Sequence, residues 1–419
     1  MRASDRSLPT ARSKRSFQYL LLVIGFSNLG DGISLVAFPL LSARYGVSPM
    51  EIGLIVFARM SPWLIFSLPA GLIIDRLSPK RIIFWVNIGR FLIATILAVL
   101  ISTETINVPI LVAVAALIGC LEVLSDNSAQ SLVPMVVDKQ QLTTALARQQ
   151  TIELVVNRFI GIPIGGFMMA QQEEAAFVSI AIAYIAAAFL VTSLCVRTER
   201  ISEDDQSGEK TSFWKELFAG ARYIWRHSVL RVLAFNTGFS NFATQAVEAV
   251  FVLFITQALK VPGWAFGIIL SMEAIGGIVG SLIVVKLKDN YGEANILRLV
   301  IFTLPFIIIF TPLFLNPWIV AGMYFLLGIS NALWGAIAVS YRQEIVPGVL
   351  MGRANAFYRL IAWGTLPLGS LVGGWSAGTF GYVVNYVLVG IFLMGAWVTL
   401  PILSTRRLEA ARKMATVQA

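Results

Sequence analysis

A short polar segment between two apolar runs reads Gly71-Leu72-Ile73-Ile74-Asp75-Arg76-Leu77-Ser78-Pro79-Lys80-Arg81. Its glycine allows two helices to approach closely, and its acid and basic side chains can pair with each other and with a helix end. Such a loop can lock in one conformation and release in another. We therefore interpret these residues as a gating motif, against the alternative of an ordinary charged turn: Gly71, Asp75, Arg76, Lys80 and Arg81.

The composition around this segment is that of a membrane protein. The 419 residues are 57% hydrophobic and 13% charged, with a mean hydropathy of +0.78. A soluble chain carries about 25% charged residues, so too little polar material is present here to cover a water-facing surface. The net charge of +9 comes from basic residues in short gaps between apolar runs. That pattern is typical of membrane orientation rather than of nucleic-acid binding.

Apolar runs long enough to cross a bilayer recur along the whole chain. A membrane helix needs about 20 mostly apolar residues. We predict an all-α integral membrane fold with twelve transmembrane helices in two pseudo-symmetric six-helix bundles. The predicted spans are 17–41, 52–74, 82–101, 109–129, 145–170, 175–196, 230–256, 265–285, 296–315, 317–340, 355–378 and 381–403.

Basic residues between these spans are distributed very unevenly. If the N-terminus is inside, the loops on the other side contain only Arg44 and Lys260. The positive-inside rule then predicts cytoplasmic termini for a multi-pass protein of the bacterial inner membrane. The predicted organisation is a tail at 1–16, a first bundle at 17–196, a linker with an amphipathic helix at 197–228, a second bundle at 229–403 and a tail at 404–419.

The two halves of the sequence repeat one another. Gly25-Phe26-Ser27-Asn28 recurs 213 residues later as Gly238-Phe239-Ser240-Asn241. A colinear series of further matches predicts parallel repeats about an axis along the membrane normal. Six glycines of this series are interpreted as helix-packing positions: Gly161, Gly165 and Gly166 in the first half, and Gly369, Gly373 and Gly374 in the second.

The gating motif, the repeat and the polar linker together resemble the major facilitator superfamily over essentially the whole chain. Within it, the sequence is similar to the drug:proton antiporter branch that includes macrolide-efflux proteins and the enterobactin exporter. The closer resemblance is carried by Asn28-Leu29-Gly30-Asp31-Gly32, by Arg90, and by the stretch 133–150. The Gly-Pro pair of the antiporter motif is split here, as Gly161-Ile162-Pro163. The resemblance implies a substrate cavity lined by the first, fourth, seventh and tenth helices.

Several charged residues fall inside apolar spans, where each costs about 2.5–3.5 kcal/mol. Asp31 lies about 14 residues into the first span, roughly 21 Å from its inner end. A carboxylate at that depth suits proton coupling, but it could equally be a structural partner of Arg90. Glu122 and Asp126 are four residues apart and share a helix face, which favours proton binding to one of them. The proton-coupling candidates are Asp31, Glu122, Asp126 and Glu248.

The remaining candidates divide between cargo and structure. Arg158 could pair with an acid or bind an anionic substrate, and Arg59 could bridge to Glu273 at the equivalent repeat position. The substrate-cavity candidates are Asn28, Asn241, Arg158, Asn331 and Trp334. The structural ion-pair candidates are Arg59, Arg90, Glu153 and Glu273.

These features favour a secondary active transporter that works by alternating access. The leading hypothesis is proton-coupled efflux of a small amphiphilic or cationic molecule, with siderophore or secreted-metabolite export as the alternative and nutrient import as a further one. An enzyme is not expected, because one histidine and two unpaired cysteines offer no catalytic or metal constellation. We expect no cofactor, a proton gradient as the energy source, and a monomer whose partners are a small-molecule substrate, protons and the lipid bilayer.

Overall fold

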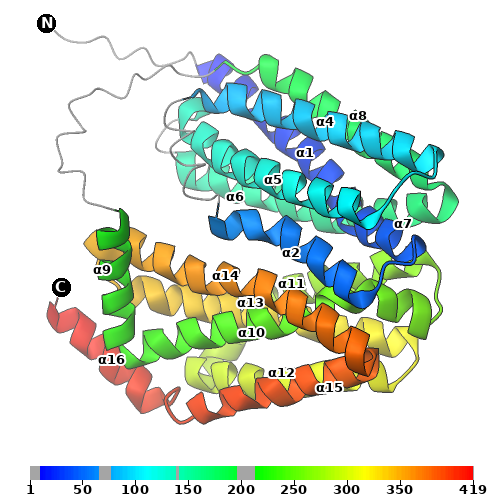
Figure 1. Cartoon of the computed structure of the whole chain (residues 1–419). Helices are drawn as coiled ribbons and strands as arrows, with labels where there is room; N and C mark the ends of the chain where they lie inside the picture. Colours follow the sequence, from blue (N-terminus) through cyan, green and yellow to red (C-terminus); the bar gives the residue numbers. More distant parts are fainter. Residues whose placement is uncertain (1–9, 66–76, 138–140, 196–212, 419) are drawn as a thin grey trace, which may run out of the picture. The chain divides into compact units, whose positions relative to one another are not determined.

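Helices form every regular element that the computed structural model describes, in residues 10–65, 77–137, 141–195 and 213–418 (Figure 1). The first half contains α1 (Thr10–Arg44), α2 (Pro49–Ile65), α4 (Pro79–Ser102), α5 (Val108–Val136), α6 (Leu142–Leu154), the π-helix η2 (Val155–Gly161), α7 (Ile162–Gln171) and α8 (Glu173–Thr192). The second half contains α9 (Phe213–Arg226), α10 (Ser228–Leu253), the π-helix η4 (Phe254–Ala258), α11 (Gly263–Tyr291), α12 (Glu293–Leu313), α13 (Pro317–Ile345), α14 (Gly348–Phe380), α15 (Tyr382–Met394), the 3₁₀ helix η5 (Gly395–Thr399) and α16 (Thr405–Gln418).

Among the described residues, ten helical segments are long and apolar enough to cross a membrane. The two other predicted spans correspond to α2 and α14. The described part of α2 has 17 residues, and the rest of its predicted span lies outside the described residues. α14 has 33 residues, but its first turns include Arg353 and Arg359, and the remainder is rich in glycine, serine, threonine and tryptophan, which lower its hydropathy.

Local sequence signals set several helix boundaries. Ser48 and Glu51 form a reciprocal capping box at the start of α2, in which the Ser48 amide donates to Glu51 Oε2 at 2.7 Å and the Glu51 amide donates to Ser48 Oγ at 3.3 Å. Asn107 and Asn316 cap α5 and α13 through a single bond each: Asn107 Oδ1 accepts from the Ile110 amide at 3.0 Å, and Asn316 Oδ1 accepts from the Trp318 amide at 2.9 Å. Gly292 has a φ of 77° and separates α11 from α12. The turns between spans are therefore short and specific.

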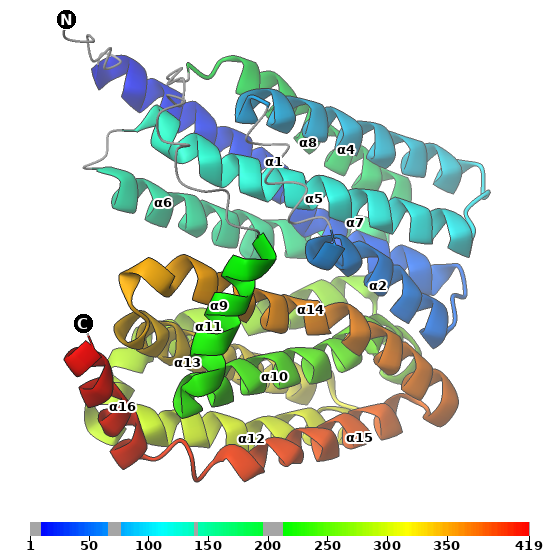
Figure 2. The same cartoon turned by 60° about the vertical axis from the view of Figure 1, so that its left-hand side comes forward.

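The chain forms two compact units. Unit 1 comprises Met1–Tyr45, Ile65–Glu209 and Pro262–Gly267. Within it, α8 packs against both α1 and α4, and α7 packs against α1 and α8. Figures 1 and 2 both show these helices running side by side.

Unit 2 comprises Gly46–Leu64, Lys210–Val261 and Ile268–Ala419. Its longest packed pair is α10 along α14, and α12 packs against α13 and α15. The amphipathic helix α9 packs on α14 and on the start of α10, and Figure 1 shows it across the ends of these helices. Its hydrophobic side is anchored by Ile224, which is 1% exposed. The predicted position of α9 on the inner membrane surface stays a prediction.

Close helix contacts at glycines follow the sequence repeat. A Cβ added to Gly165 of α7 would lie 2.8 Å from the carbonyl oxygen of Ile33 in α1. Gly373 of α14 lies in the same way against the carbonyl oxygen of Ala246 in α10. Ile33 and Ala246 are 213 residues apart, which is the offset of the repeat. Equivalent positions therefore make equivalent contacts in the two units.

The same symmetry explains why unit 2 contains α2 and unit 1 contains the first turn of α11. A Cβ on Gly374 would lie 3.0 Å from the Cα of Gly53 in α2. A Cβ on Gly166 would lie 3.4 Å from the Cα of Gly267 in α11. Each of these glycine pairs is the repeat counterpart of the other, so both units gain a helix segment from the opposite half of the sequence.

Candidate functional site

The centre of unit 1 holds a buried ion pair between Asp31 of α1 and Arg90 of α4. The Arg90 Nη1 atom lies 3.4 Å from Asp31 Oδ2, and the Arg90 side chain is only 1% exposed. Nη1 also donates to Ser27 Oγ at 3.2 Å. Asp31 and Arg90 both lie well inside predicted membrane spans, so the pair sits at membrane depth.

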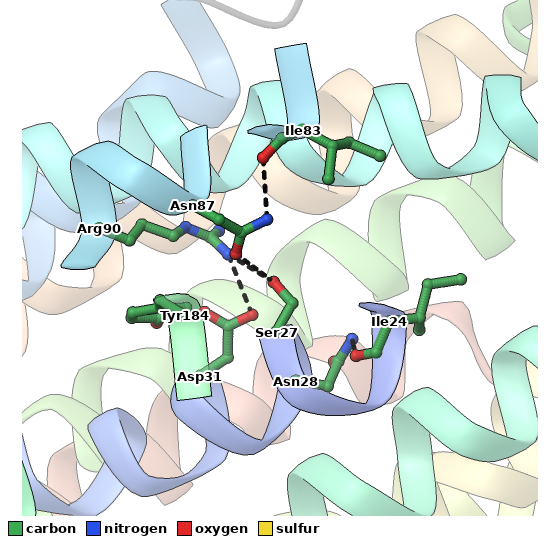
Figure 3. Close-up of polar contacts among 8 residues, drawn as sticks. All are labelled: Ile24, Ser27, Asn28, Asp31, Ile83, Asn87, Arg90 and Tyr184. Carbon is green, nitrogen blue, oxygen red and sulfur yellow. Dashed lines mark hydrogen bonds and ion pairs between the residues drawn. The ribbon is translucent and has the colours of Figure 1, made fainter. Parts of the chain in front are cut away.

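Neutral polar side chains complete this network (Figure 3). The Tyr184 hydroxyl of α8 donates to Asp31 Oδ1 at 2.9 Å. The Ser27 hydroxyl donates to Asn87 Oδ1 at 3.2 Å, and Asn87 Nδ2 donates to the Ile83 carbonyl oxygen at 2.9 Å. The Arg90 guanidinium also lies 5.3 Å from the centre of the Tyr184 ring. Three helices are thus tied together around one carboxylate.

The guanidinium is not fully satisfied in this arrangement. Arg90 Nε and Nη2 are buried and make no hydrogen bond within the described part of the chain. A buried donor without an acceptor costs about 1–3 kcal/mol, and more when it is charged. Arg90 therefore has the capacity to bind a second acceptor besides Asp31.

Acidic side chains lie within electrostatic reach of the pair. Asp126 of α5 interacts with Glu122, Asp31, Arg90 and Glu153. Asp126 is itself exposed in the structure, and a carboxylate at membrane depth is stable only where it faces water or protein rather than lipid. The structure thus gathers three of the four predicted proton-coupling residues into one cluster.

A π-helical turn lies against α1 beside this cluster. The backbone of Asn157 in η2 approaches Gly32, and a Cβ on Gly161 would lie 2.7 Å from the Gly32 Cα. Any larger residue than glycine would separate the two helices. Arg158 of η2 is exposed and makes no ion pair with a described residue. Short π-helical turns occur often at functional sites.

The other candidates of the first half make local contacts. Asn28 Nδ2 donates to the Ile24 carbonyl oxygen of its own helix at 3.0 Å (Figure 3). Gln149 Nε2 donates to Glu153 Oε1 at 2.7 Å. Arg59 is half-buried in α2. Its bridge to Glu273 stays a prediction.

The gating motif is only partly described. Gly71, Asp75 and Arg76 lie outside the described residues, whereas Lys80 Nζ donates to the carbonyl oxygens of Thr192 and Leu194 at 2.8 and 2.6 Å. Lys80 thereby satisfies backbone acceptors at the end of α8, where a cation is favoured. Arg81 is exposed.

In unit 2 the predicted residues lie in separate places. Asn241 Nδ2 donates to the Ala362 carbonyl oxygen at 2.6 Å, and Asn331 Nδ2 donates to Glu273 Oε1 at 3.1 Å. Trp334 Nε1 donates to Thr237 Oγ1 at 3.0 Å. Glu248 lines a small cavity together with two tyrosines and two threonines: Tyr324, Tyr386, Thr244 and Thr311.

Sequence reasoning identified the charges of the unit 1 site but not its neutral partners. Ser27, Asn87 and Tyr184 carry no charge, so a search for ionisable residues in apolar runs does not identify them. The signal that could have found Asn87 is its position, which is one helical turn before Arg90 on the same face. No comparable signal identifies Tyr184.

The family model described as transmembrane secretion effector matches residues 9–417. The chain belongs to this family of major facilitator transporters. The transporter is 28% identical to the staphyloferrin A transporter of Staphylococcus aureus over 347 residues, which are 81% of this chain and 84% of that protein. It is 25% identical to the multidrug efflux pump Tap of Mycolicibacterium fortuitum over 386 residues, 88% of this chain and 92% of that protein.

Solved structures show the same fold. The nucleoside transporter NupG superposes with a TM-score of 0.73 at 12% identity, over 93% of this transporter and 99% of that chain. A bacterial homologue of the human lysosomal transporter Spinster gives 0.72 at 13% identity, over 96% and 99%. The transporter is therefore a multi-pass bacterial membrane protein with the major facilitator fold.

Proposed function

We propose that this transporter exports a small amphiphilic or cationic molecule from the cytoplasm in exchange for protons. The observation that carries the proposal is the buried pair of Asp31 and Arg90, whose guanidinium keeps two donors without acceptors. Protonation of Asp31 removes its negative charge, so the attraction that holds Arg90 to α1 falls. Arg90 then turns to another acceptor.

The acidic pair on α5 is the acceptor that we propose for Arg90. Asp126 and Glu122 both interact electrostatically with Arg90. A proton bound at Asp31 therefore shifts Arg90 from α1 towards α5, and its release reverses the shift. Such a change of partner between two helices of one bundle is a two-state element through which protonation can select a conformation.

The proposed substrate class follows from the charges at membrane depth in unit 1. Inside the predicted spans 17–41, 82–101, 109–129 and 145–170, the carboxylates of Asp31, Glu122, Asp126 and Glu153 outnumber the guanidinium groups of Arg90, Arg148 and Arg158. A surplus of negative charge favours cationic and amphiphilic molecules. Tap, a relative, is described as a multidrug efflux pump, which agrees with this assignment.

A siderophore or another secreted metabolite is the second candidate cargo. It is favoured by the similarity to the staphyloferrin A transporter, which extends over 81% of this chain. The two candidates share one transport cycle and differ in the cargo. We further propose that the transporter acts as a monomer in the inner membrane with both termini in the cytoplasm.

The proposal is tested with purified transporter in liposomes that enclose a pH-sensitive dye and have an acidic lumen. Adding ethidium as a cationic probe is expected to raise the lumenal pH, because protons leave as ethidium enters. Asp31→Asn and Glu122→Gln should each reduce the initial rate at least tenfold. Glu104→Gln is the matched control, because Glu104 is an exposed acid between α4 and α5. An unchanged rate and final gradient in Asp31→Asn would refute the coupling mechanism.

A further inference from the structure

Unit 2 contains a second arginine at a helix contact, and it has no acidic partner. Arg342 lies on α13, three residues before the helix ends at Ile345. None of the ion pairs in the described part of the chain includes Arg342. The neighbouring acid Glu344 is already bound by Arg412, whose Nη2 lies 2.7 Å from Glu344 Oε2. The charge of Arg342 is therefore uncompensated.

The guanidinium of Arg342 is nevertheless held firmly in one orientation. Its Nε donates to Asn355 Oδ1 of α14 at 2.8 Å, and its Cζ lies 3.9 Å from the centre of the Tyr358 ring. Stacking on an aromatic ring and one hydrogen bond at Nε fix the plane of the group. Nη1 is buried and finds no acceptor within the described residues.

Two aromatic residues near Arg342 (Trp334 and Tyr358) are held in place by hydrogen bonds to one threonine. Thr237 Oγ1 of α10 donates to the Leu233 carbonyl oxygen at 2.9 Å, so its single proton is used. It must then accept from both Trp334 Nε1, at 3.0 Å, and the Tyr358 hydroxyl. The indole and phenol rings are thereby held in place.

Arg342, Trp334, Tyr358 and Thr237 are all half-buried, so each still presents part of its surface. A structural arginine at a helix contact is usually paired with a carboxylate, whereas this one is oriented and left unpaired. A planar cation with donors to spare beside two ordered aromatic rings fits a carboxylate attached to an apolar or aromatic body.

We propose that Arg342 binds the carboxylate of the transported molecule, with Trp334 and Tyr358 contacting its apolar part. This inference rests on the proposed function, and it narrows the cargo to amphiphiles that carry a carboxylate together with a cationic group. Asn355 acts as a positioning residue, because it holds the guanidinium through Nε.

The test is binding to full-length purified transporter in a neutral detergent, measured by isothermal titration calorimetry. The probes are 1-naphthoate and 1-naphthylmethylammonium, which have the same ring system and opposite charge. Naphthoate binding is expected to depend on Arg342, whereas binding of the ammonium probe should not depend on it. Arg342→Gln should weaken naphthoate binding at least tenfold, and Arg342→Lys should weaken it less.

The matched control is Arg359→Gln, because Arg359 is an exposed arginine next to Tyr358 and reports any long-range effect of charge. If Arg342→Gln unfolds, Trp334→Phe gives a second readout: naphthoate should quench less tryptophan fluorescence in this variant than in the native protein. Equal naphthoate affinity in Arg342→Gln, or an equal loss of affinity for both probes in this variant, overturns the proposal.

A lipid headgroup could supply the same anionic chemistry. Repeating the titration in phosphatidylcholine nanodiscs with and without phosphatidylglycerol separates the two sources. Unchanged naphthoate affinity supports the carboxylate cargo, and loss of binding when phosphatidylglycerol is present assigns Arg342 to lipid. The titration contains no proton gradient, so a failure here leaves ethidium-driven proton movement, and with it the proposed exchange, untouched.

Discussion

At the scale of single residues, the Asp31–Arg90 pair shows why a buried ion pair is informative about mechanism rather than about stability. Bringing two charges out of water costs about as much as their attraction returns. Removing one partner is different, because the other charge is then left uncompensated. Arg90, at 1% exposure, has no route to water that would relieve this cost.

A double-mutant cycle on Asp31 and Arg90 tests this reasoning. Asp31→Asn is expected to lower the free energy of unfolding by about 3–5 kcal/mol, since it removes the carboxylate that contacts the buried guanidinium directly. The double variant Asp31→Asn with Arg90→Gln should be more stable than the sum of the two single changes predicts. Denaturant unfolding of the purified variants measures both quantities. Strictly additive losses would show that the two side chains do not act as a pair.

The sequence predicted the charged members of this site and missed the neutral ones for a physical reason. A carboxylate or guanidinium in an apolar run costs several kcal/mol, so its presence there demands an explanation. Ser27 carries no such penalty, because a serine hydroxyl in a helix can donate to its own backbone, and Tyr184 presents mainly an apolar ring. Only the three-dimensional packing of α1, α4 and α8 shows that they serve Asp31 and Arg90.

At the scale of elements, the junction between α9 and α10 links the amphipathic helix to the membrane bundle. The Tyr223 hydroxyl donates to the Ile345 carbonyl oxygen at 2.9 Å, and Gly220 approaches the backbone of Arg353. His227, the only histidine of the chain, is the N-cap residue of α10. Its Nδ1 is buried and makes no hydrogen bond to any residue described. Protonation of His227 is therefore expected to destabilise the packing at this junction.

The stability of the transporter should depend on pH through His227. Burial lowers the pKa of His227 below its ordinary value of 6.5. Well above pH 6.5, His227 is neutral in both the folded and the unfolded state. As the pH falls from 6.5 towards the lowered pKa of the folded state, the unfolded chain binds more protons, so the folded state loses stability. His227→Gln should remove this part of the loss, which is read from thermal unfolding between pH 5 and pH 8.

The comparison of the native protein with His227→Gln at pH 8 is the control, because His227 is then uncharged in both the folded and the unfolded state. The two proteins should diverge only on the acid side. Parallel curves from pH 5 to pH 8 would contradict a titrating role for His227.

The ends of elements were harder to predict than their positions. The predicted spans 317–340 and 355–378 correspond to α13 and α14, but the helices extend to Ile345 and begin again at Gly348. Hydropathy records the length that lies in lipid, whereas backbone hydrogen bonds continue the helix into the polar region. Val346-Pro347 ends this continuation, because proline has no amide hydrogen to donate.

At the scale of the whole molecule, the repeat is the feature that sequence and structure share most directly. The alignment of glycines at 161, 165 and 166 with those at 369, 373 and 374 came from spacing alone. In the structure these positions make corresponding backbone contacts in unit 1 and unit 2. Spacing could not show that α2 belongs to unit 2, because that depends on a contact between distant segments, Gly53 and Gly374.

The repeat makes a matched pair of variants informative. Gly165→Ala and Gly373→Ala each place a Cβ against a backbone carbonyl of the neighbouring helix, Ile33 in one unit and Ala246 in the other. Backbone atoms cannot move aside as a flexible side chain can, so each variant should lose about 1–3 kcal/mol of unfolding free energy.

Gly322→Ala in α13 is the control, because a Cβ there meets nothing within 4 Å. Alanine is the better helix former, so this control should be neutral or gain up to about 1 kcal/mol. Losses of similar size at Gly165 and Gly373, against no loss at Gly322, would show that both bundles depend on the same close contact. A loss at only one of the two positions would mean that equivalent glycines of the repeat do not contribute equally to the stability of the two bundles.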